Sequence, residues 1–301
     1  MIKVVNNIKD ANCVTHSGTM HADEVFATAF LELYKGDVSV FRTTSVGEVD
    51  DSVLVYDVGR GKYDHHQIDA VKRENGITYS SFGLLWRDFG KSFLEKCDFS
   101  NIDDLWSEID KDLVEGIDAD DNGFFPKIET EPNHRVKTLP NIIKIFNPSF
   151  DSGEDESTQF LKAVNLAKTI IEEEIYYING KVMASKKVNE IIEDTDPNSK
   201  YLILEEFLPY EEAILNNPNT GNLLFVAFPS NRGGYAIKTI SKSLDDKTAR
   251  MPFPEEWAGL QDKELEEVSK IPGLRFCHTA RFIVSCKDLN VVHKVLDLLC
   301  K

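Results

Sequence analysis

Residues 11–57 read ANCVTHSGTMHADEVFATAFLELYKGDVSVFRTTSVGEVDDSVLVYD, and this stretch decides the fold. Short apolar or β-branched runs at 11–15, 38–41 and 53–56 predict strands, and the apolar spacing over 21–34 predicts an amphipathic helix. This β-α-β-β order is typical of the start of an α/β sheet.

Two polar residues follow predicted strands directly. His16 comes after the first run and Asp57 after the run that ends at Tyr56. In open parallel sheets, ligands bind outside the carboxyl ends of the strands. We therefore expect these two side chains to lie at a functional edge.

The remaining chain predicts further helices and a second domain. Helical patterns cover 78–97, 102–117 and 154–194, the last as one long helix or a helix pair, and four prolines between 126 and 148 place the domain linkage at about 124–150. We expect an N-terminal domain over 1–140, with helices on both faces of a parallel sheet, and a smaller α+β domain over 141–301. The second domain is predicted from strands at 201–204, 223–228, 235–240 and within 275–286, most simply antiparallel, and from helices at 262–270 and 288–300.

Composition limits the classes of protein that fit. Apolar residues make up 42% and charged residues 28% of the 301 residues, as in a soluble globular protein. The net charge of −17 repels long polyanions, so any nucleic-acid substrate is expected to be short. No apolar run is long enough for a membrane span, and the first ten residues lack a signal or transit pattern. The five cysteines form no Cys-x-x-Cys pair, and we expect a cytoplasmic protein with reduced thiols.

Two short clusters contain side chains that bind metals. The first is Thr15-His-Ser-Gly-Thr-Met-His-Ala-Asp-Glu24, and the second runs from Asp57 to Asp64-His65-His66. Mixed carboxylate and imidazole ligands suit a divalent ion such as Mn²⁺, with Mg²⁺ or Co²⁺ as alternatives, and this number of ligands suits two ions. Asp57 is the candidate bridge between the ions, and the chemistry indicated is hydrolysis, first of all of a phosphoester.

Structural interpretations of the same residues stay open. His21 and Asp23 also fit a helix cap with an acidic first turn. Asp64-His65-His66 also fits an exposed polar turn, and Asp118 to Asp121 also fits a helix that stops at Asn122-Gly123. The residues Lys238, Lys242, Lys247 and Arg250 predict either a phosphate-facing patch or a solvated face.

These motifs resemble the DHH phosphoesterase superfamily and, more closely, the Myg family, whose eukaryotic branch includes a 3′-to-5′ RNA exonuclease. The resemblance runs over nearly the whole chain. Besides the two clusters it rests on Asp57-Val-Gly59, Tyr63-Asp-His-His-Gln67, Ile117-Asp-Ala-Asp-Asp-Asn-Gly123, Met251-Pro-Phe-Pro-Glu-Glu-Trp-Ala-Gly-Leu260 and Ile271-Pro-Gly273.

The resemblance implies a role for each residue of the site. It implies that one ion is held by His16, His21 and Asp57, and the other by Asp23, Asp57, His65 and either Asp118, which is favoured, or Asp121. It implies that His66 contacts the substrate phosphate and helps to protonate the leaving oxygen, and that Asp64 orients a neighbouring imidazole.

The resemblance also implies a substrate-binding C-terminal domain that closes over a cleft, with Arg250 and His278 as substrate contacts. This chain departs from the family in that domain. Phe282-Ile-Val-Ser285 stands where relatives often read Phe-Ile-Gly-Gly, and Arg281 replaces a small residue. A glycine pair lets backbone amides approach a phosphate closely, so this chain lacks that route.

Three functions follow from these observations. The first is a Mn²⁺-dependent phosphodiesterase or 3′-to-5′ exonuclease that acts on short RNA or small nucleotides through two ions. The second is a phosphatase or pyrophosphatase of a small phosphorylated metabolite, and the third is a non-catalytic regulator that binds metal or nucleotide. An oligomer is compatible with each function.

Overall fold

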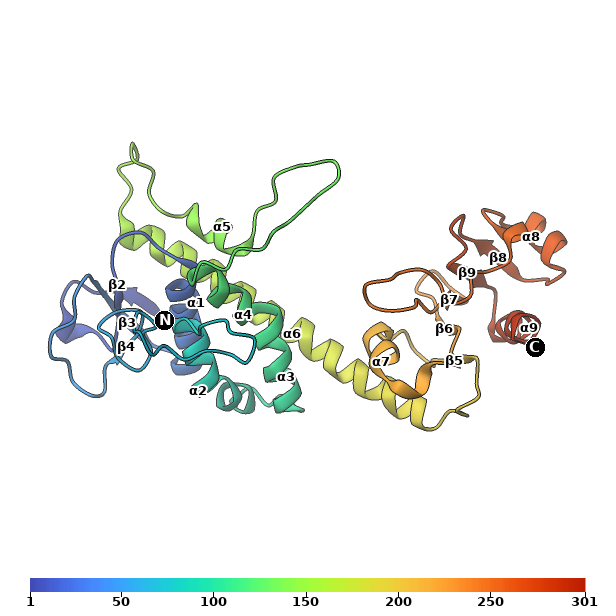
Figure 1. The fold of residues 1–301 in the computed structure, drawn as a ribbon, viewed down its shortest axis with the longest axis horizontal. Coiled ribbons are helices and arrows are strands. Elements are labelled where there is room, and N and C mark those ends of the chain that lie inside the picture. Colours follow the sequence, from blue (N-terminus) through green and yellow to red (C-terminus); the bar gives the residue numbers. More distant parts are fainter. Residues whose placement is uncertain (301) are drawn as a thin grey trace. The chain divides into compact units, whose positions relative to one another are not determined.

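The computed structural model describes residues 1–300, which form two compact units. The first unit is Met1–Asn179, and the second begins at Gly180. It is an α/β protein with a parallel sheet flanked by helices in the first unit and a mixed sheet in the second (Figure 1). The fold class predicted from the sequence is therefore confirmed.

The first sheet holds four parallel strands in the order β1-β3-β2-β4. They are β1 (Ile2–Val4), β2 (Cys13–His16), β3 (Val38–Thr43) and β4 (Leu54–Val55). Strand β2 lies between β3 and β4, and its first three residues are fully buried, which accounts for their apolar and β-branched character. The three predicted strands are present; β1, a three-residue edge strand, was not predicted.

Helix α1 (Ala22–Lys35) is buried along an unbroken run from Ala22 to Glu32. It was predicted to be amphipathic, but its polar residues Asp23, Glu24 and Thr28 are also fully buried, so it behaves as a core helix. Helix α2 (Ser81–Lys96) packs beside it, and the ring centroid of Phe30 lies 5.4 Å from that of Trp86. This aromatic contact fixes α1 relative to α2.

Helix α3 (Ile102–Ile109), a π-helical turn over Asp110–Val114 and α4 (Glu115–Asp121) follow without a break. The helix predicted over 102–117 is therefore confirmed, and it extends to Asp121. Helix α5 (Leu139–Lys144) contacts both α1 and α4.

Helix α6 (Glu156–Glu193) runs through both units, and their division falls inside it. Its first half buries Phe160 and Val164, and its second half buries Val188 and Ile192 in the core of the second unit. The boundary expected between residues 140 and 141 lies before this division, because the first half of α6 packs on the first unit. The assignment of separate functions to 1–140 and 141–301 stays a prediction.

The second sheet has the order β5-β6-β7-β9-β8, with bounds Tyr201–Ile203, Phe225–Pro229, Tyr235–Thr239, Ile283–Cys286 and Leu274–Cys277 respectively. The prediction of an antiparallel sheet is wrong for one pair, since β5 and β6 are parallel. The segment between them contains α7 (Glu211–Asn216), and such a crossover returns the chain in the same direction, whereas a hairpin would reverse it.

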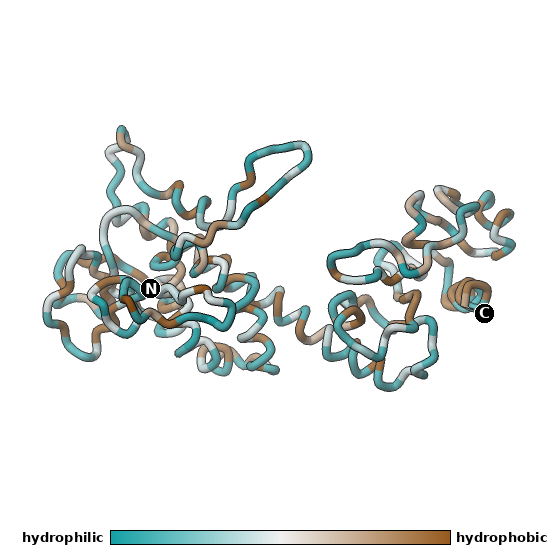
Figure 2. The backbone as a smooth tube through the Cα atoms, viewed as in Figure 1, coloured by the Kyte–Doolittle hydropathy of each residue, from teal (hydrophilic) through white to brown (hydrophobic). Residues whose placement is uncertain are grey.

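Helices α8 (Asp262–Ser269) and α9 (Leu289–Leu299) complete the second unit. Helix α9 carries both hydrophobic and hydrophilic residues (Figure 2), and it buries Val291, Val292, Val295 and Leu296. Within residues 1–300 no helix combines the length and apolarity required to cross a bilayer. The cytoplasmic location stays a prediction.

Phe30→Ala is expected to destabilise the first unit by about 3–5 kcal/mol, because it removes a fully buried ring from the α1–α2 contact. Chemical denaturation of the full chain measures the loss. The matched control is Phe150→Ala, whose ring is fully exposed and whose loss should stay within about 0.5 kcal/mol. Equal losses in the two variants would contradict this description of the core.

Candidate metal centre

Two neighbouring strands bring the first ligand candidates together. Strands β2 and β4 pair in parallel, so His16 at the end of β2 and Asp57 just beyond β4 emerge at the same edge. Asp57 has a φ of 56°, in the left-handed region that aspartate tolerates better than most residues. This backbone places a carboxylate oxygen of Asp57 2.9 Å from Nδ1 of His16.

The start of α1 supplies three more polar side chains. The amide of His21 donates to the carboxylate of Glu24 at 2.9 Å, so the cap of this helix is formed by Glu24. Asp23 is fully buried and accepts a long hydrogen bond from the amide of Ser81 at 3.3 Å. The loop before the helix is held by Asn147, which bonds both the amide and the carbonyl of Met20.

The Asp64-His65-His66 turn folds around the Asp64 carboxylate. Asp64 accepts hydrogen bonds from the amide of Arg60 at 2.6 Å and the amide of His66 at 3.0 Å, and lies 2.8 Å from Nδ1 of His66. Burial raises the pKa of Asp64, but these bonds outweigh it and the net pKa is lowered. An ionised Asp64 thus lies within hydrogen-bond distance of the imidazole of His66, and its role in orienting a metal-site imidazole stays a prediction.

Helix α4 separates the two aspartates that were candidates for one ligand position. Asp121 faces the cluster, with its carboxylate 2.8 Å from Nε2 of His65 and 3.5 Å from Nδ1 of His21. Asp118, three residues earlier, is fully buried and bonds to Arg73, Ser80 and the amide of Gly83. The geometry therefore favours Asp121, although Asp118 was favoured from the sequence.

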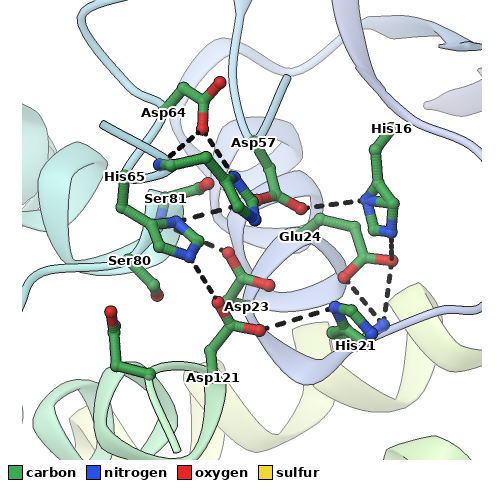
Figure 3. Close-up of polar contacts among 12 residues, drawn as sticks. His16, His21, Asp23, Glu24, Asp57, Asp64, His65, Ser80, Ser81 and Asp121 are labelled. Carbon is green, nitrogen blue, oxygen red and sulfur yellow. Dashed lines mark hydrogen bonds and ion pairs between the residues drawn. The ribbon is translucent and has the colours of Figure 1, made fainter. Parts of the chain in front are cut away.

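Figure 3 shows side chains from these four segments pointing toward a common centre. Four groups, each with ligand atoms within 4.8 Å of one another, can be formed from them, and Asp57 belongs to two of the groups. The groups are Asp57-Asp64-His65-His66, His16-His21-Glu24, His21-Asp23-Asp121 and Asp23-Glu24-Asp57.

Several buried atoms in this centre have no hydrogen-bond partner within residues 1–300. They include one carboxylate oxygen each of Asp23 and Asp57, and the Nδ1 atoms of His16 and His65. Buried polar atoms are normally paired, because an unpaired one costs about 1–3 kcal/mol. These atoms are of the types that ligate divalent ions, and the residues therefore fit a metal centre.

The charges give a second reason to place cations here. Burial, and then the charges of Asp57 and Asp121, raise the pKa of Asp23 well above its usual value, and burial with Asp57 does the same for Glu24. Burial lowers the pKa of His65, but the hydrogen bond and the charge of Asp121 outweigh burial, so the net pKa is raised. A bound divalent ion would stabilise the ionised carboxylates that otherwise repel one another.

The centre opens into a pocket of about 290 Å³. Its lining includes His16, His21, Asp57 and the exposed imidazole of His66. Arg60 also lines it and contributes a cation next to the carboxylates. Substrate can thus reach the cluster from solvent.

Arg250 and His278, the two substrate contacts expected in the second unit, form hydrogen bonds with the backbone of their own unit. The guanidinium of Arg250 donates to the carbonyls of Thr220 at 2.7 Å, Leu223 at 3.0 Å and Ser241 at 3.1 Å. Nδ1 of His278 accepts from the amide of Ala280 at 3.0 Å. Both side chains hold loops in this structure, and their contact with substrate stays a prediction.

Sequence reasoning missed several residues that build the centre. Glu24 lies inside a quoted motif but was given no role, although an acid three residues after a helix start is a capping signal. Arg73 and Ser80 bind Asp118, and Gly83 leaves room for its carboxylate. These three residues lie 35 to 45 positions before Asp118 along the chain. No local pattern points to contacts of such long range.

The fold and this cluster define an α/β protein with a candidate metal centre at the carboxyl edge of a parallel sheet. The model of a family described as uncharacterised protein family UPF0160, MYG1 exonuclease, matches residues 12–298. The chain therefore belongs to the MYG1 family.

Relatives extend over nearly the whole chain. A MYG1 protein of Saccharomyces cerevisiae is 27% identical over 98% of this chain and 97% of its own length. The human MYG1 exonuclease is 29% identical over 89% of this chain and 80% of its own. A MYG1 protein of Chlamydia trachomatis is 27% identical over 95% and 96% respectively. No solved structure matches significantly.

Addition of Mn²⁺ is expected to raise the unfolding temperature, and a chelator to reverse the rise, because a ligand that binds only the folded state stabilises it by about 2.7 kcal/mol at 100 times Kd. Asp121→Asn should abolish most of the rise, whereas Asp120→Asn, next to it but outside the four groups, should retain it. Thermal unfolding of the three proteins with and without Mn²⁺ provides the test. A full rise in Asp121→Asn would remove Asp121 from the ligands.

Gly83→Ala is expected to destabilise the protein by about 1–3 kcal/mol, since a Cβ there would overlap the Asp118 carboxylate. The matched control is Gly116→Ala in α4, where a Cβ meets nothing within 4 Å and the helix should gain about 0.5–1 kcal/mol. Denaturant midpoints of both variants decide the matter. A neutral Gly83→Ala would show that Asp118 is not held as described.

Proposed function

We propose that the protein is a metal-dependent phosphoesterase, most specifically a Mn²⁺-dependent phosphodiesterase or 3′-to-5′ exonuclease that acts on short RNA or small nucleotides. The observation that carries the proposal is the overlap of four ligand groups, in which His21, Asp23, Glu24 and Asp57 each belong to two groups, together with the unpaired buried carboxylate oxygens of Asp23 and Asp57. The human relative is named an exonuclease, which supports the proposal.

The ligand sets are those that the family resemblance implies, with Asp121 chosen over Asp118 because its carboxylate lies 2.8 Å from Nε2 of His65. We propose His16, His21 and Asp57 for one ion, and Asp23, Asp57, His65 and Asp121 for the other. When bound, two divalent ions supply a hydroxide nucleophile at neutral pH and neutralise charge on the phosphoryl group. Glu24 belongs to two of the four groups of ligand atoms but to neither proposed set, and its bond to the His21 amide holds the start of α1 in place.

His66 contacts substrate in this proposal. Its Nδ1 lies 2.8 Å from the ionised Asp64, so Nε2 is the atom left to meet a phosphate oxygen or to donate a proton to the leaving oxygen. Its side chain is 61% exposed and lines the pocket, which such a role requires. The Asp64-His65-His66 motif and the ligand arrangement also support membership of the DHH phosphoesterase superfamily, which we include in the proposal.

The net charge of −17 and the small pocket favour short substrates over long polymers. A phosphatase or pyrophosphatase shares the same chemistry and is separated from an exonuclease by its products. The comparison uses purified protein with Mn²⁺, Mg²⁺, Co²⁺ or chelator on 5′- and 3′-labelled oligoribonucleotides, dinucleotides and pyrophosphate. Stepwise release of mononucleotides from the 3′ end supports the proposal, and turnover of pyrophosphate alone supports the phosphatase.

Asp57→Asn is expected to reduce turnover by more than about a hundredfold, since even residues behind metal ligands cost about 10- to 100-fold. Asparagine tolerates the left-handed backbone at this position, so the fold should survive. The matched control is Asp69→Asn, an exposed aspartate in the loop beyond the motif, which should keep full turnover. Turnover like the wild type in Asp57→Asn would refute the two-ion proposal.

A further inference from the structure

The second unit contains a pocket of about 560 Å³ whose chemistry differs from that of the metal centre. Strand β7, the loops after β7 and β8, and Glu211 at the start of α7 supply its lining. The lining includes three cationic side chains, Lys238, Lys247 and Arg281, and the aromatic ring of Phe282.

The structure settles which members of the basic set noticed in the sequence share this pocket. Lys238 and Lys247 line it, whereas Arg250 turns to backbone carbonyls and Lys242 is not part of the lining. Arg281 joins the two lysines. Three cations gathered in one pocket of a chain with a net charge of −17 create a local positive potential that attracts small anions.

A single carboxylate already occupies part of this positive site. Glu211 lies 3.0 Å from Nζ of Lys238 and 3.5 Å from Nζ of Lys247. The hydrogen bond from Lys238 holds the pKa of Glu211 below its usual value, so the carboxylate is ionised. With three cations and one acid in the lining, an excess of positive charge remains for a ligand.

Arg281 is held at the pocket by an uncommon backbone. Its φ is 56°, and its amide donates to the carbonyl of His278 at 2.8 Å in the turn between β8 and β9. A long side chain in the left-handed region costs about 1 kcal/mol relative to glycine or asparagine. Its guanidinium donates to the carbonyl of Phe253 at 3.3 Å, and no carboxylate pairs with it among residues 1–300. This leaves its remaining donors for an oxyanion.

We propose that this pocket binds the phosphate of a nucleotide, with Arg281, Lys238 and Lys247 on the phosphate, Phe282 beside the base, and Glu211 as an internal competitor that occupies the lysines in the absence of ligand. Arginine and lysine suit phosphate through charge-assisted hydrogen bonds. The choice of a nucleotide over other phosphates rests on the proposed function. The inference that the pocket binds an anion rests only on the residues that line it.

The test measures binding of adenosine 5′-monophosphate to the full chain by calorimetry in excess chelator. Binding is expected, and adenosine should not bind. Glu211→Gln should tighten binding by about tenfold, because it removes the competing charge. Arg281→Ala and Lys238→Ala should each weaken it by at least about tenfold. Lys242→Ala, the same loss of charge outside the pocket, should leave it unchanged.

The Glu211→Gln arm protects the test against misfolding, since a gain in affinity is not produced by a damaged protein. Weaker binding in Glu211→Gln, or equal losses in Lys242→Ala and Arg281→Ala, would overturn the proposal. Binding of inorganic phosphate as tight as that of the mononucleotide would remove the base contact at Phe282 and overturn the nucleotide assignment.

The outcome is separable from that of the proposed function. The binding assay contains no metal, so it is expected to give the same result in Asp57→Asn as in the natural chain. If the natural chain binds the mononucleotide but hydrolyses no substrate with Mn²⁺, the result counts against the metal centre alone; if it hydrolyses substrate but does not bind the mononucleotide, the result counts against this pocket alone.

Discussion

Mutual repulsion among buried carboxylates at one edge of the first sheet is the constraint on which the structure depends. Asp23, Glu24 and Asp57 lie within ligand distance of one another and are almost excluded from water. Such an arrangement is costly unless protons or cations balance it, and the imidazoles of His16 and His65 stand close enough to share in that balance. The local fold serves to hold these groups together.

The supports of the centre come from distant parts of the chain. Parallel pairing of β2 with β4 brings His16 and Asp57 to one edge, and burial of α1 fixes Asp23. Asp118 ties α4 to the start of α2 through Ser80 and Gly83, which leaves Asp121 facing the cluster. Asp118, which the sequence favoured as a ligand, thus orients α4 so that Asp121 faces the cluster.

The sequence predicts the fold well where local patterns repeat. The strands and helices from 11 to 97 follow from local patterns, whereas residues 154–194 left one helix or a helix pair open and form the single helix α6. The parallel pairing of β5 with β6 was missed because α7, which makes the crossover, has only six residues and gives a weak signal. The edge strand β1 was missed for the same reason.

The site was predictable as a set of residues but not as an arrangement. His16, His21, Asp23, Asp57 and His65 come from short motifs, and the structure brings them together. The choice between Asp118 and Asp121 depends on which face of α4 meets Arg73, a contact across 45 residues that no local spacing encodes. The pocket around Arg281 and Glu211 depends likewise on tertiary contacts.

The continuous helix α6 limits how the chain can be dissected. A fragment that ends at residue 140 would lose Phe160, Val164 and Ala167, which are fully buried against the first unit, and would leave their cavity open to water. A fragment that begins near residue 180 keeps Ala184 and Val188 but starts in the middle of a helix without a cap. Any attempt to express the metal centre alone must therefore carry α6 at least to Asn179, and recombination between relatives is best tolerated outside this helix.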